Sequence, residues 1–327
     1  MQRSCHAASV LSGDLQLDLS PRMKYSLSSI VRAIREPRFA TREINRIGHT
    51  RFGKYKHNPK GIDIFKKDWD NLIILDACRY DEFVSASSDW DIDTVPKYSQ
   101  ASLTEEFVRA NFSGRKLHDT VYVSANSWYL RIKEEIDSEV HRFVDLQSGR
   151  HDVEWVDEPL RVVTPETVTR FAEEAAERHP NKRLIVHYLQ PHHPFVGPTG
   201  TEHFSHQSNS LQEVYFESDA SDNLLRDAYR ENLEIVIDAV RQLVPELTGR
   251  TIITADHGEM LGDRHSFIPM KDYGHHRGIF NDANNRVPWT VIESDQRKEI
   301  VESAPQNDQD VDTDRIDEQL RNLGYKL

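Results

Sequence analysis

Short apolar runs rich in β-branched residues recur along the chain and alternate with longer segments of helical periodicity. The runs cover residues 71–75, 120–125, 183–189, 251–255 and 287–293. The helical patterns cover residues 104–112, 127–137, 164–178 and 222–246. Strands that alternate with helices are typical of a mostly parallel sheet with helices on both faces. The sequence therefore predicts a doubly wound α/β fold.

The two ends of the chain lack this alternation and are predicted to be separate segments. Residues 1–60 contain a polar tail and short basic helices, and residues 296–327 form a charged segment with a helical pattern near its end. We expect the α/β domain to span residues 61–295, with the C-terminal helix packing on it or forming a homodimer. The polar segment 199–222 is expected to be a loop over the functional site.

Two basic helices are predicted at residues 27–36 and 40–48, separated at Pro37. The basic face of residues 27–48 is compatible with a weak contact to an anionic membrane surface, although a solvated face is the simpler interpretation. No run in the sequence approaches the roughly 18 apolar residues that a membrane-spanning helix requires.

The charge and the cysteine content narrow the classes of function. The 327 residues carry a net charge of -13, which disfavours binding to nucleic acid because the phosphate backbone is also negative. The two cysteines, Cys5 and Cys78, provide no disulfide framework and suit a reducing compartment. We therefore expect a cytoplasmic protein that does not bind nucleic acid.

Acidic residues and histidines stand just after three of the predicted strands and just before the last one. They occur, mostly beside glycine or proline, at Asp76, Asp256, His257, His192, His193, His275 and His276. Because ligands bind beyond the carboxyl ends of parallel strands, these side chains are predicted to share one edge of the sheet. Carboxylates with imidazole suit a divalent cation such as Mn²⁺, Zn²⁺, Mg²⁺ or Ca²⁺. Taken alone, Asp76 could instead cap a helix, and Asp256-His257 could form a turn.

Four segments resemble motifs of the alkaline phosphatase/sulfatase superfamily. They are NLIILDACRYDEF from residue 71, PHHPF from residue 191, TIITADHGEMLGD from residue 251 and GHHRGIFNDANNRVPW from residue 274. DHGEMLGD is the most specific of them. The resemblance implies an alkaline phosphatase-like fold, a divalent cation held by Asp76, Asp256 and His257, and phosphate or sulfate esters as substrates. The acid-rich composition is similar to that of sulfatase-like proteins of halophilic archaea.

The resemblance also indicates where the nucleophile stands. Sulfatases carry it in C-x-P-x-R, ten residues before a glycine, at the start of a helix. This chain has no such motif and has Ala77 in place of the second acid of the first sulfatase motif, which favours a hydroxyl nucleophile, as in phosphatases and phospho-group transferases. Thr104 lies ten residues before Gly114 and is the expected nucleophile, with Ser102 as the alternative. Thr104 could also simply cap a helix.

Further roles follow from the resemblance alone. His192 and His275 would hold substrate oxygens, protonate the leaving group or bind a second cation. The candidates for substrate binding are Arg79, Arg109, His193 and His276. For the two arginines a structural role is the simpler interpretation, and the two histidines are the neighbouring alternatives to His192 and His275.

Three functions stay open at this point. The first is a metal-dependent hydrolase of phosphate or sulfate esters, acting on surface glycans through Thr104. The second is a transferase that moves such a group onto a glycan or a lipid-linked sugar. The third is a catalytically degenerate protein that binds a glycan or a partner.

Overall fold

The computed structural model describes residues 37–147, 151, 153, 155, 162–204, 210–306 and 313–325. The chain divides into two compact units, residues 1–40 and residues 41–327. The helix predicted at residues 27–36 and the residue Cys5 lie outside the described residues, and the predicted domain boundaries near residues 60 and 295 stay a prediction. The second unit contains the sheet and all of the candidate site residues.

A seven-stranded sheet forms the centre of the second unit, in the order β2-β9-β6-β1-β5-β3-β4. The strands are β1 (Asn71–Leu75), β2 (Thr94–Tyr98), β3 (Lys116–Ser124), β4 (Glu139–Asp145), β5 (Arg183–Tyr188), β6 (Thr251–Thr254) and β9 (Arg286–Ile292). The neighbours β6, β1, β5, β3 and β4 are parallel, whereas β9 runs antiparallel to both β6 and β2.

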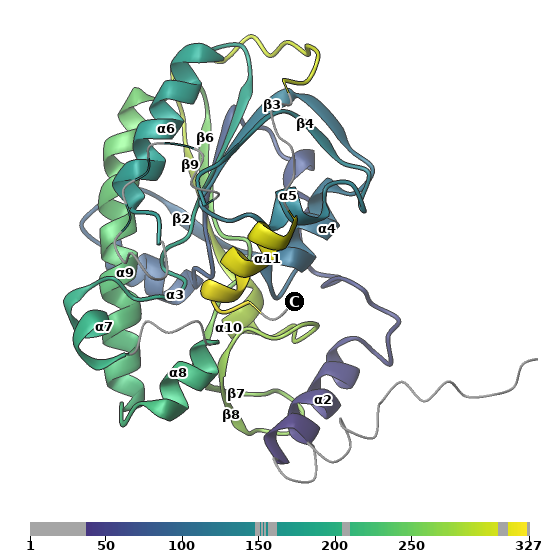
Figure 1. The fold of residues 1–327 in the computed structure, drawn as a ribbon, viewed down its shortest axis with the longest axis vertical. Helices are drawn as coiled ribbons and strands as arrows, with labels where there is room; N and C mark the ends of the chain where they lie inside the picture. Colours follow the sequence, from purple (N-terminus) through teal and green to yellow (C-terminus); the bar gives the residue numbers. More distant parts are fainter. Residues whose placement is uncertain are drawn as a thin grey trace, which may run out of the picture. The chain divides into compact units, whose positions relative to one another are not determined.

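Helices cover both faces of this sheet (Figure 1). One face carries α3 (Tyr80–Ala86), α6 (Pro165–Arg178) and α9 (Asp222–Leu243), and the other carries α4 (Thr104–Phe112), α5 (Trp128–Ile132) and α11 (Thr313–Asn322). The predicted fold class, a doubly wound and mostly parallel α/β sheet, is therefore confirmed.

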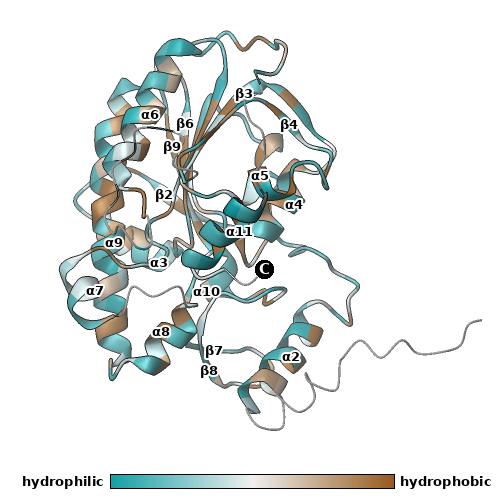
Figure 2. Ribbon diagram, viewed as in Figure 1, coloured by the Kyte–Doolittle hydropathy of each residue, from teal (hydrophilic) through white to brown (hydrophobic). Residues whose placement is uncertain are grey.

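The central strand β1 shows why the sheet lies in the core. All five of its residues are buried, and four of them are consecutive apolar residues, Leu72 to Leu75. A parallel strand between two others is covered on both faces, so a continuous apolar run fits it better than an alternating one. Each such side chain contributes about 1.5–3 kcal/mol when it is fully buried. Figure 2 shows the contrast between the apolar strands and the hydrophilic outer sides of the helices.

Smaller elements complete the unit. A two-stranded antiparallel sheet pairs β7 (Met260–Arg264) with β8 (Lys271–Gly274). The remaining helices are α2 (Pro37–His49), α7 (Pro198–His203), α8 (Leu211–Glu217), α10 (Asp282–Asn285) and the short 3-10 helices η1 (Ile64–Lys66) and η2 (Val244–Glu246). Among the described residues, no helix combines the length and the apolar character needed to cross a membrane.

Several local predictions differ from the structure. Segment 199–222, expected to be a loop, includes most of α7 and all of α8. Helix α2 begins at Pro37, three residues before the predicted helix 40–48, because a proline is tolerated in the first turn of a helix. Strand β2 was not predicted, because Pro96 and its polar neighbours interrupt the apolar pattern of a strand. It lies at the edge of the sheet, where a proline is tolerated. Helix α5 is shorter than the predicted 127–137.

Candidate active site

The carboxyl ends of four neighbouring strands bring the candidate residues to one edge of the sheet. Asp76 directly follows β1, and Asp256 stands two residues after β6. Asn126 follows β3, and His192 follows β5. Because β6, β1, β5 and β3 are adjacent and parallel, these side chains converge although they are far apart in the sequence.

The first group consists of the three predicted metal ligands. Asp76, Asp256 and His257 each offer a ligand atom, and these atoms all lie within 4.8 Å of one another. His257 Nε2 is 3.3 Å from Asp256 Oδ2 and 3.6 Å from Asp76 Oδ1. All three side chains are fully buried. The structure thus brings together the three residues that sequence motifs assigned to a cation.

Hydrogen bonds fix the orientation of this group. Asp256 Oδ1 accepts hydrogen bonds from the backbone N–H of Ala77 (3.0 Å) and of His257 (2.8 Å). His257 Nδ1 lies 2.8 Å from the carbonyl oxygen of Gly258, so its Nε2 faces the acids. Asp256 Oδ2 is buried and makes no hydrogen bond within the described part of the chain. A buried carboxylate oxygen of this kind fits a cation ligand.

The alternative role of Asp76 as a helix cap is not seen. Helix α3 begins at Tyr80, its cap position is Arg79, and no side chain caps it. Asp76 instead faces its acidic neighbour. Its pKa is raised well above the usual value, first by burial and then by the charge of Asp256. Two buried acids of this kind call for a compensating positive charge.

Thr104 lies against the first group. Its Oγ1 is 3.5 Å from both carboxylate oxygens of Asp76 and 3.3 Å from His257 Nε2. Helix α4 begins at Thr104, but the cap position is Leu103 and no side chain caps the helix. The hydroxyl therefore faces the acids and the imidazole and does not serve as the cap. A helix N-terminus behind it also favours negative charge at this place.

Ser102, the alternative nucleophile, belongs to a different network. Its Oγ donates a hydrogen bond to Glu106 Oε2 (2.8 Å) and accepts one from the backbone N–H of Gly278 (2.9 Å). Its side chain is fully buried. These contacts join α4 to the segment after β8 and leave the hydroxyl occupied.

Two further residues touch Asp76 and were not among the sequence-based candidates. Tyr325 OH donates a hydrogen bond to Asp76 Oδ2 (2.9 Å) and lies 3.3 Å from Thr104 Oγ1. Asn126 Nδ2 is 2.8 Å from Asp76 Oδ2 and 2.9 Å from Tyr325 OH. The position of Asn126 directly beyond a strand was a usable signal, but nothing in the sequence pointed to Tyr325.

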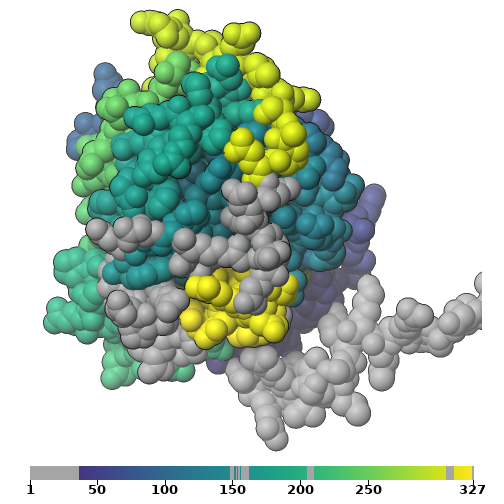
Figure 3. All heavy atoms as spheres, turned by 45° about the horizontal axis from the view of Figure 1, so that its top comes forward, coloured from purple at the N-terminus to yellow at the C-terminus, as the bar shows by residue number. Residues whose placement is uncertain are grey.

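The C-terminal helix explains how Tyr325 reaches this place. Helix α11 packs on α5, and its last turn leads directly to Tyr325, which is buried. The Tyr325 ring stacks on His192, with 5.1 Å between the ring centres. Figure 3 shows the C-terminal residues, in yellow, as part of the surface of the unit. The predicted C-terminal helix is thus present, and it supplies a residue to the candidate site.

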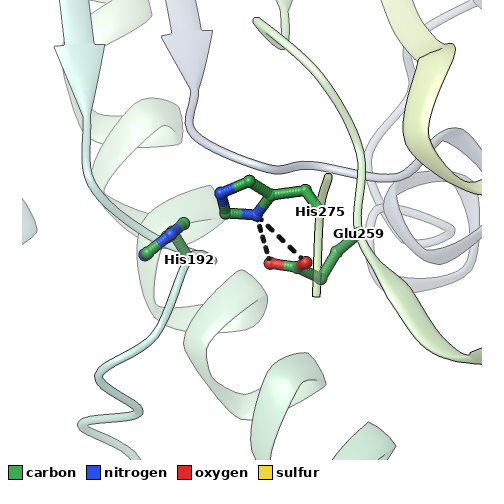
Figure 4. Close-up of side chains that lie close together, drawn as sticks. All are labelled: His192, Glu259 and His275. Carbon is green, nitrogen blue, oxygen red and sulfur yellow. Dashed lines mark hydrogen bonds and ion pairs between the residues drawn. The ribbon is translucent and has the colours of Figure 1, made fainter. Parts of the chain in front are cut away.

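A second group lies beside the first. His192, Glu259 and His275 also bring their ligand atoms within 4.8 Å of one another, and Figure 4 shows their arrangement. His275 Nδ1 is 3.1 Å and 3.3 Å from the two carboxylate oxygens of Glu259. His192 Nε2 is buried and has no hydrogen-bond partner among the described residues. The rings of His257 and His275 are 4.4 Å apart, so the two groups are neighbours.

Glu259 was not among the candidates from the sequence, although it belongs to the DHGE motif. Burial raises its pKa to about 7. Burial also lowers the pKa of His275 to about 4 and that of His192 well below its usual value. Each shift favours the neutral form, because taking a charge out of water is unfavourable unless another charge compensates it.

The alternative histidines lie next to these groups. The ring of His193 stacks on that of His192, with 4.5 Å between their centres. His276 Nε2 is 3.3 Å from Asp272 Oδ2, and Asp272 forms a bidentate ion pair with Arg42 of α2. His276 therefore contacts a different acid from that of His275.

The two candidate arginines hold acidic residues of the protein itself. Arg79 is buried and forms ion pairs with Asp81 (2.7 Å) and Asp263 (2.5 Å). Arg109 forms ion pairs with Glu105 (2.7 Å) and Glu135 (2.8 Å). These contacts agree with the structural role that sequence analysis left open for both.

Gly258 explains why the motif around Asp256 requires a glycine. A Cβ atom at this position would lie 2.2 Å from the carbonyl oxygen of Ala283. The backbone N–H of Gly258 also donates a hydrogen bond to the carbonyl oxygen of Asn284 (2.7 Å). The close approach of α10 to the loop that carries Asp256 and His257 therefore leaves no room for a side chain.

Comparison with known proteins finds similarity only to solved structures. No protein-family model and no curated protein matches the chain. The integral membrane lipooligosaccharide phosphoethanolamine transferase A from Neisseria meningitidis matches with a TM-score of 0.48 and 12% identity, over 69% of this chain and 47% of that one. The C-terminal periplasmic domain of EcEptC from Escherichia coli, in complex with Zn, matches with a TM-score of 0.43 and 13% identity, over 69% and 72%.

A protein in the alkaline phosphatase superfamily from Vibrio parahaemolyticus matches with a TM-score of 0.43 and 11% identity, over 79% of this chain and 67% of that one. The chain spans about half the length (47%) of the Neisseria transferase. Similarity at this level does not determine an activity, so a function has to be argued from the residues of this chain.

Proposed function

We propose that the protein is a metal-dependent enzyme that transfers or hydrolyses phosphate or sulfate esters, with Thr104 as its nucleophile. One observation carries this proposal. The Thr104 hydroxyl lies 3.3–3.5 Å from Asp76 and His257, inside a buried group of three potential metal ligands. A hydroxyl at a helix start beside such a group is suited to nucleophilic attack on phosphorus or sulfur.

Asp76, Asp256 and His257 would hold the cation. A bound divalent cation supplies positive charge that lowers the pKa of a nearby hydroxyl and stabilises negative charge on the substrate. Asn126 and Tyr325 hold Asp76 by hydrogen bonds to its Oδ2. This contact orients the carboxylate, as hydrogen-bonded neighbours of metal ligands commonly do.

The chemistry of Thr104 follows from its position. Its oxygen forms a bond to the phosphorus or sulfur of the ester, while the bond to the leaving oxygen breaks. The second group would act at the opposite end of this displacement. His192, Glu259 and His275 either hold a second cation or bind substrate oxygens and deliver a proton to the leaving group.

The acceptor in the second half of the reaction distinguishes hydrolysis from transfer. Water as the acceptor gives a hydrolase, and a hydroxyl group of a glycan or lipid-linked sugar gives a transferase. Both share the Thr104 step, so the same experiment covers them. Surface glycans remain our proposed target, and a cytoplasmic location remains a prediction.

Three measurements on the full chain test this proposal. Metal analysis of the purified protein should find a divalent cation, and Asp256→Ala should reduce its amount. A screen of phosphomonoesters, phosphodiesters and sulfate esters, with and without an alcohol acceptor, should reveal turnover. Thr104→Ala should abolish the turnover, whereas Thr104→Ser should retain part of it.

Two results would contradict the assignments. Unchanged metal content in Asp256→Ala would remove the proposed ligand set. Full activity in Thr104→Ala would show that Thr104 is not the nucleophile and would leave Ser102 or water as the candidates. A metal-free wild-type protein with no turnover would favour the third function, a catalytically degenerate protein that binds a glycan or a partner.

A further inference from the structure

Some of the most exposed large apolar side chains of the described chain gather around the C-terminal half of α2. Ile44 is 50% exposed, Phe52 88%, Phe267 57% and Ile268 38%. We call these four residues the apolar patch. A phenylalanine that exposes most of its surface to water is unfavourable in a protein that has no partner for it.

Contacts within the unit place Phe267 and Ile268 beside α2. Asn45 Oδ1 accepts hydrogen bonds from the backbone N–H of Phe267 (2.9 Å) and of Ile268 (3.1 Å). The Phe267 ring lies so close to Gly48 that a Cβ atom there would be 2.7 Å from it. The loop between β7 and β8 is thus hydrogen-bonded to the helix that carries Ile44. Phe52 lies three residues after the end of that helix.

Phe52 is presented by an unusual backbone turn. The residues Arg51, Phe52 and Gly53 all have positive φ, at 45°, 59° and 82°. Positive φ is rare for a bulky residue such as phenylalanine, so the turn is costly. It directs the chain away from α2 and leaves the Phe52 ring in solvent. A functional reason for exposing this side chain is therefore worth seeking.

The charge around the patch is opposite to that of the whole protein. Residues 41–60 contain six basic residues and one acidic residue, a net charge of +5, within a chain whose net charge is -13. Arg51, Lys54 and Lys56 are exposed and make no ion pair with the described residues. A positive region with protruding aromatic rings is the combination that binds the interface of an anionic bilayer.

A cavity adjoins the patch. Its volume is ≈ 440 Å³. The residues that line it include Gly53 and Tyr55, which follow Phe52 in the chain, the basic residues Lys56 and His57, and the acidic Glu106. The lining arginines form ion pairs with acids of the protein itself: Arg46 with Glu43, Arg109 with Glu105 and Glu135, and Arg277 with Glu105. Lys56 is exposed and has no acidic partner among the described residues, so it is the lining cation that an acidic lipid head group would contact.

We propose that this surface docks the protein on an anionic phospholipid membrane, with Phe52 and Phe267 inserted between head groups and Arg51, Lys54 and Lys56 in contact with lipid phosphates. A lipid surface fits this region because apolar side chains lie beside cations that have no acidic partner among the described residues. A second copy of this chain, with its net charge of -13, would match the cations but not the exposed rings. Docking is independent of the proposed ester chemistry.

A chain of ion pairs connects α2 to the segment beside the second group. Arg42, on the same helix as Ile44, forms a bidentate ion pair with Asp272. Asp272 in turn contacts His276, the residue that follows His275 of the second group. The helix that carries Ile44 is therefore linked, through Arg42 and Asp272, to the segment that carries His275.

Vesicle sedimentation with the full chain tests the docking. Wild-type protein should sediment with vesicles of phosphatidylcholine that contain about one third phosphatidylglycerol, and not with pure phosphatidylcholine. The double variant Phe52→Ser/Phe267→Ser should lose at least tenfold in partitioning. Arg51→Glu/Lys54→Glu/Lys56→Glu should lose at least as much, because each cation near an anionic surface strengthens binding about fivefold.

Matched variants elsewhere on the surface serve as controls. Val301→Ser removes an exposed apolar side chain (45%) outside the patch, and Arg178→Glu reverses an exposed charge on α6. Both should sediment as the wild type does. Equal thermal midpoints of all variants would show that folding is intact.

Two results would overturn the proposal. The first is sedimentation of the patch variants to the same extent as the wild type, or no sedimentation of wild type with anionic vesicles. The second is a concentration-dependent dimer that dissociates in Phe52→Ser/Phe267→Ser, because it would assign the patch to a second copy of the chain.

Discussion

Replacing Asp256 with asparagine should stabilise the metal-free protein and at the same time remove its stabilisation by metal. Asparagine retains the Oδ1 atom, which accepts the hydrogen bonds from Ala77 and His257, so the loop after β6 keeps its anchor. The substitution removes one negative charge beside Asp76, whose pKa is raised by burial and by that charge. The two effects have opposite signs, which makes the test selective.

The expected magnitudes follow from the geometry. The ligand atoms of the first group lie within 4.8 Å of one another, and two unit charges at that upper limit repel each other by about 3.5 kcal/mol at an effective dielectric constant of about 20. Proton uptake by Asp76 relieves part of this repulsion in the wild type. We therefore expect the free energy of unfolding of metal-free Asp256→Asn to be about 1–3 kcal/mol higher than that of the wild type. A cation at a hundredfold excess over its Kd stabilises the wild type by about 2.7 kcal/mol.

Urea unfolding at pH 7 measures both quantities. Each protein is measured after EDTA treatment and again in a saturating concentration of the metal that analysis identifies. Without metal, Asp256→Asn should unfold at a higher urea concentration than the wild type. With metal, the wild type should gain stability while the variant changes little.

A second carboxylate provides the matched control. Asp263 pairs with Arg79 and lies outside both groups of potential ligands. Asp263→Asn should be destabilised in both conditions and should keep the response to metal. The reasoning fails if Asp256→Asn is less stable than wild type in EDTA, or if metal stabilises it as strongly as it stabilises the wild type.

Three further predictions concern other parts of the site. Tyr325→Phe removes a hydrogen bond to a buried carboxylate and should cost about 1.5–3 kcal/mol in urea unfolding, with about 10–100-fold weaker metal binding in calorimetry; unchanged metal affinity would exclude an orienting role. Burial lowers the pKa of His187 to about 4, below its unfolded value of 6.5. The stability that neutral His187 contributes is therefore fully present above pH 6.5 and is lost as the pH falls through 4, which lowers the free energy of unfolding by about 3 kcal/mol. In His187→Gln the stability of the metal-free protein should depend less on pH over this range. Gly258→Ala should lower metal binding, because its Cβ would approach a backbone oxygen to 2.2 Å; wild-type affinity by calorimetry would contradict the close contact.

The sequence identified the parts of the site that depend on strand ends. The run that forms β1 is continuous and apolar because both faces of the strand are covered, and the acid after it therefore had to lie at the carboxyl edge. The same reasoning located Asp256 and His257 after β6. Order and adjacency of the strands did not need to be known, because any parallel arrangement places these ends at one edge.

Residues that reach the site through distant packing could not be found this way. Tyr325 lies 249 positions from Asp76, and the helical pattern of α11 predicts a helix but not the surface on which it packs. Glu259 was visible in its motif, yet its role depends on the orientation of His275, which the sequence does not contain. Strand β2 was missed because its residues are not apolar; its partner β9 determines its place.

The burial of three acids is itself an argument for function. Asp76, Asp256 and Glu259 are almost completely inaccessible to solvent, although a helix cap or a turn would leave such side chains at the surface. Burying them raises the pKa of Asp76 and of Glu259, so the metal-free site is less stable than an apolar one of the same size. Such an arrangement is useful to a protein when a bound cation compensates the charge, and the adjacent hydroxyl of Thr104 is the group whose reactivity that cation would change.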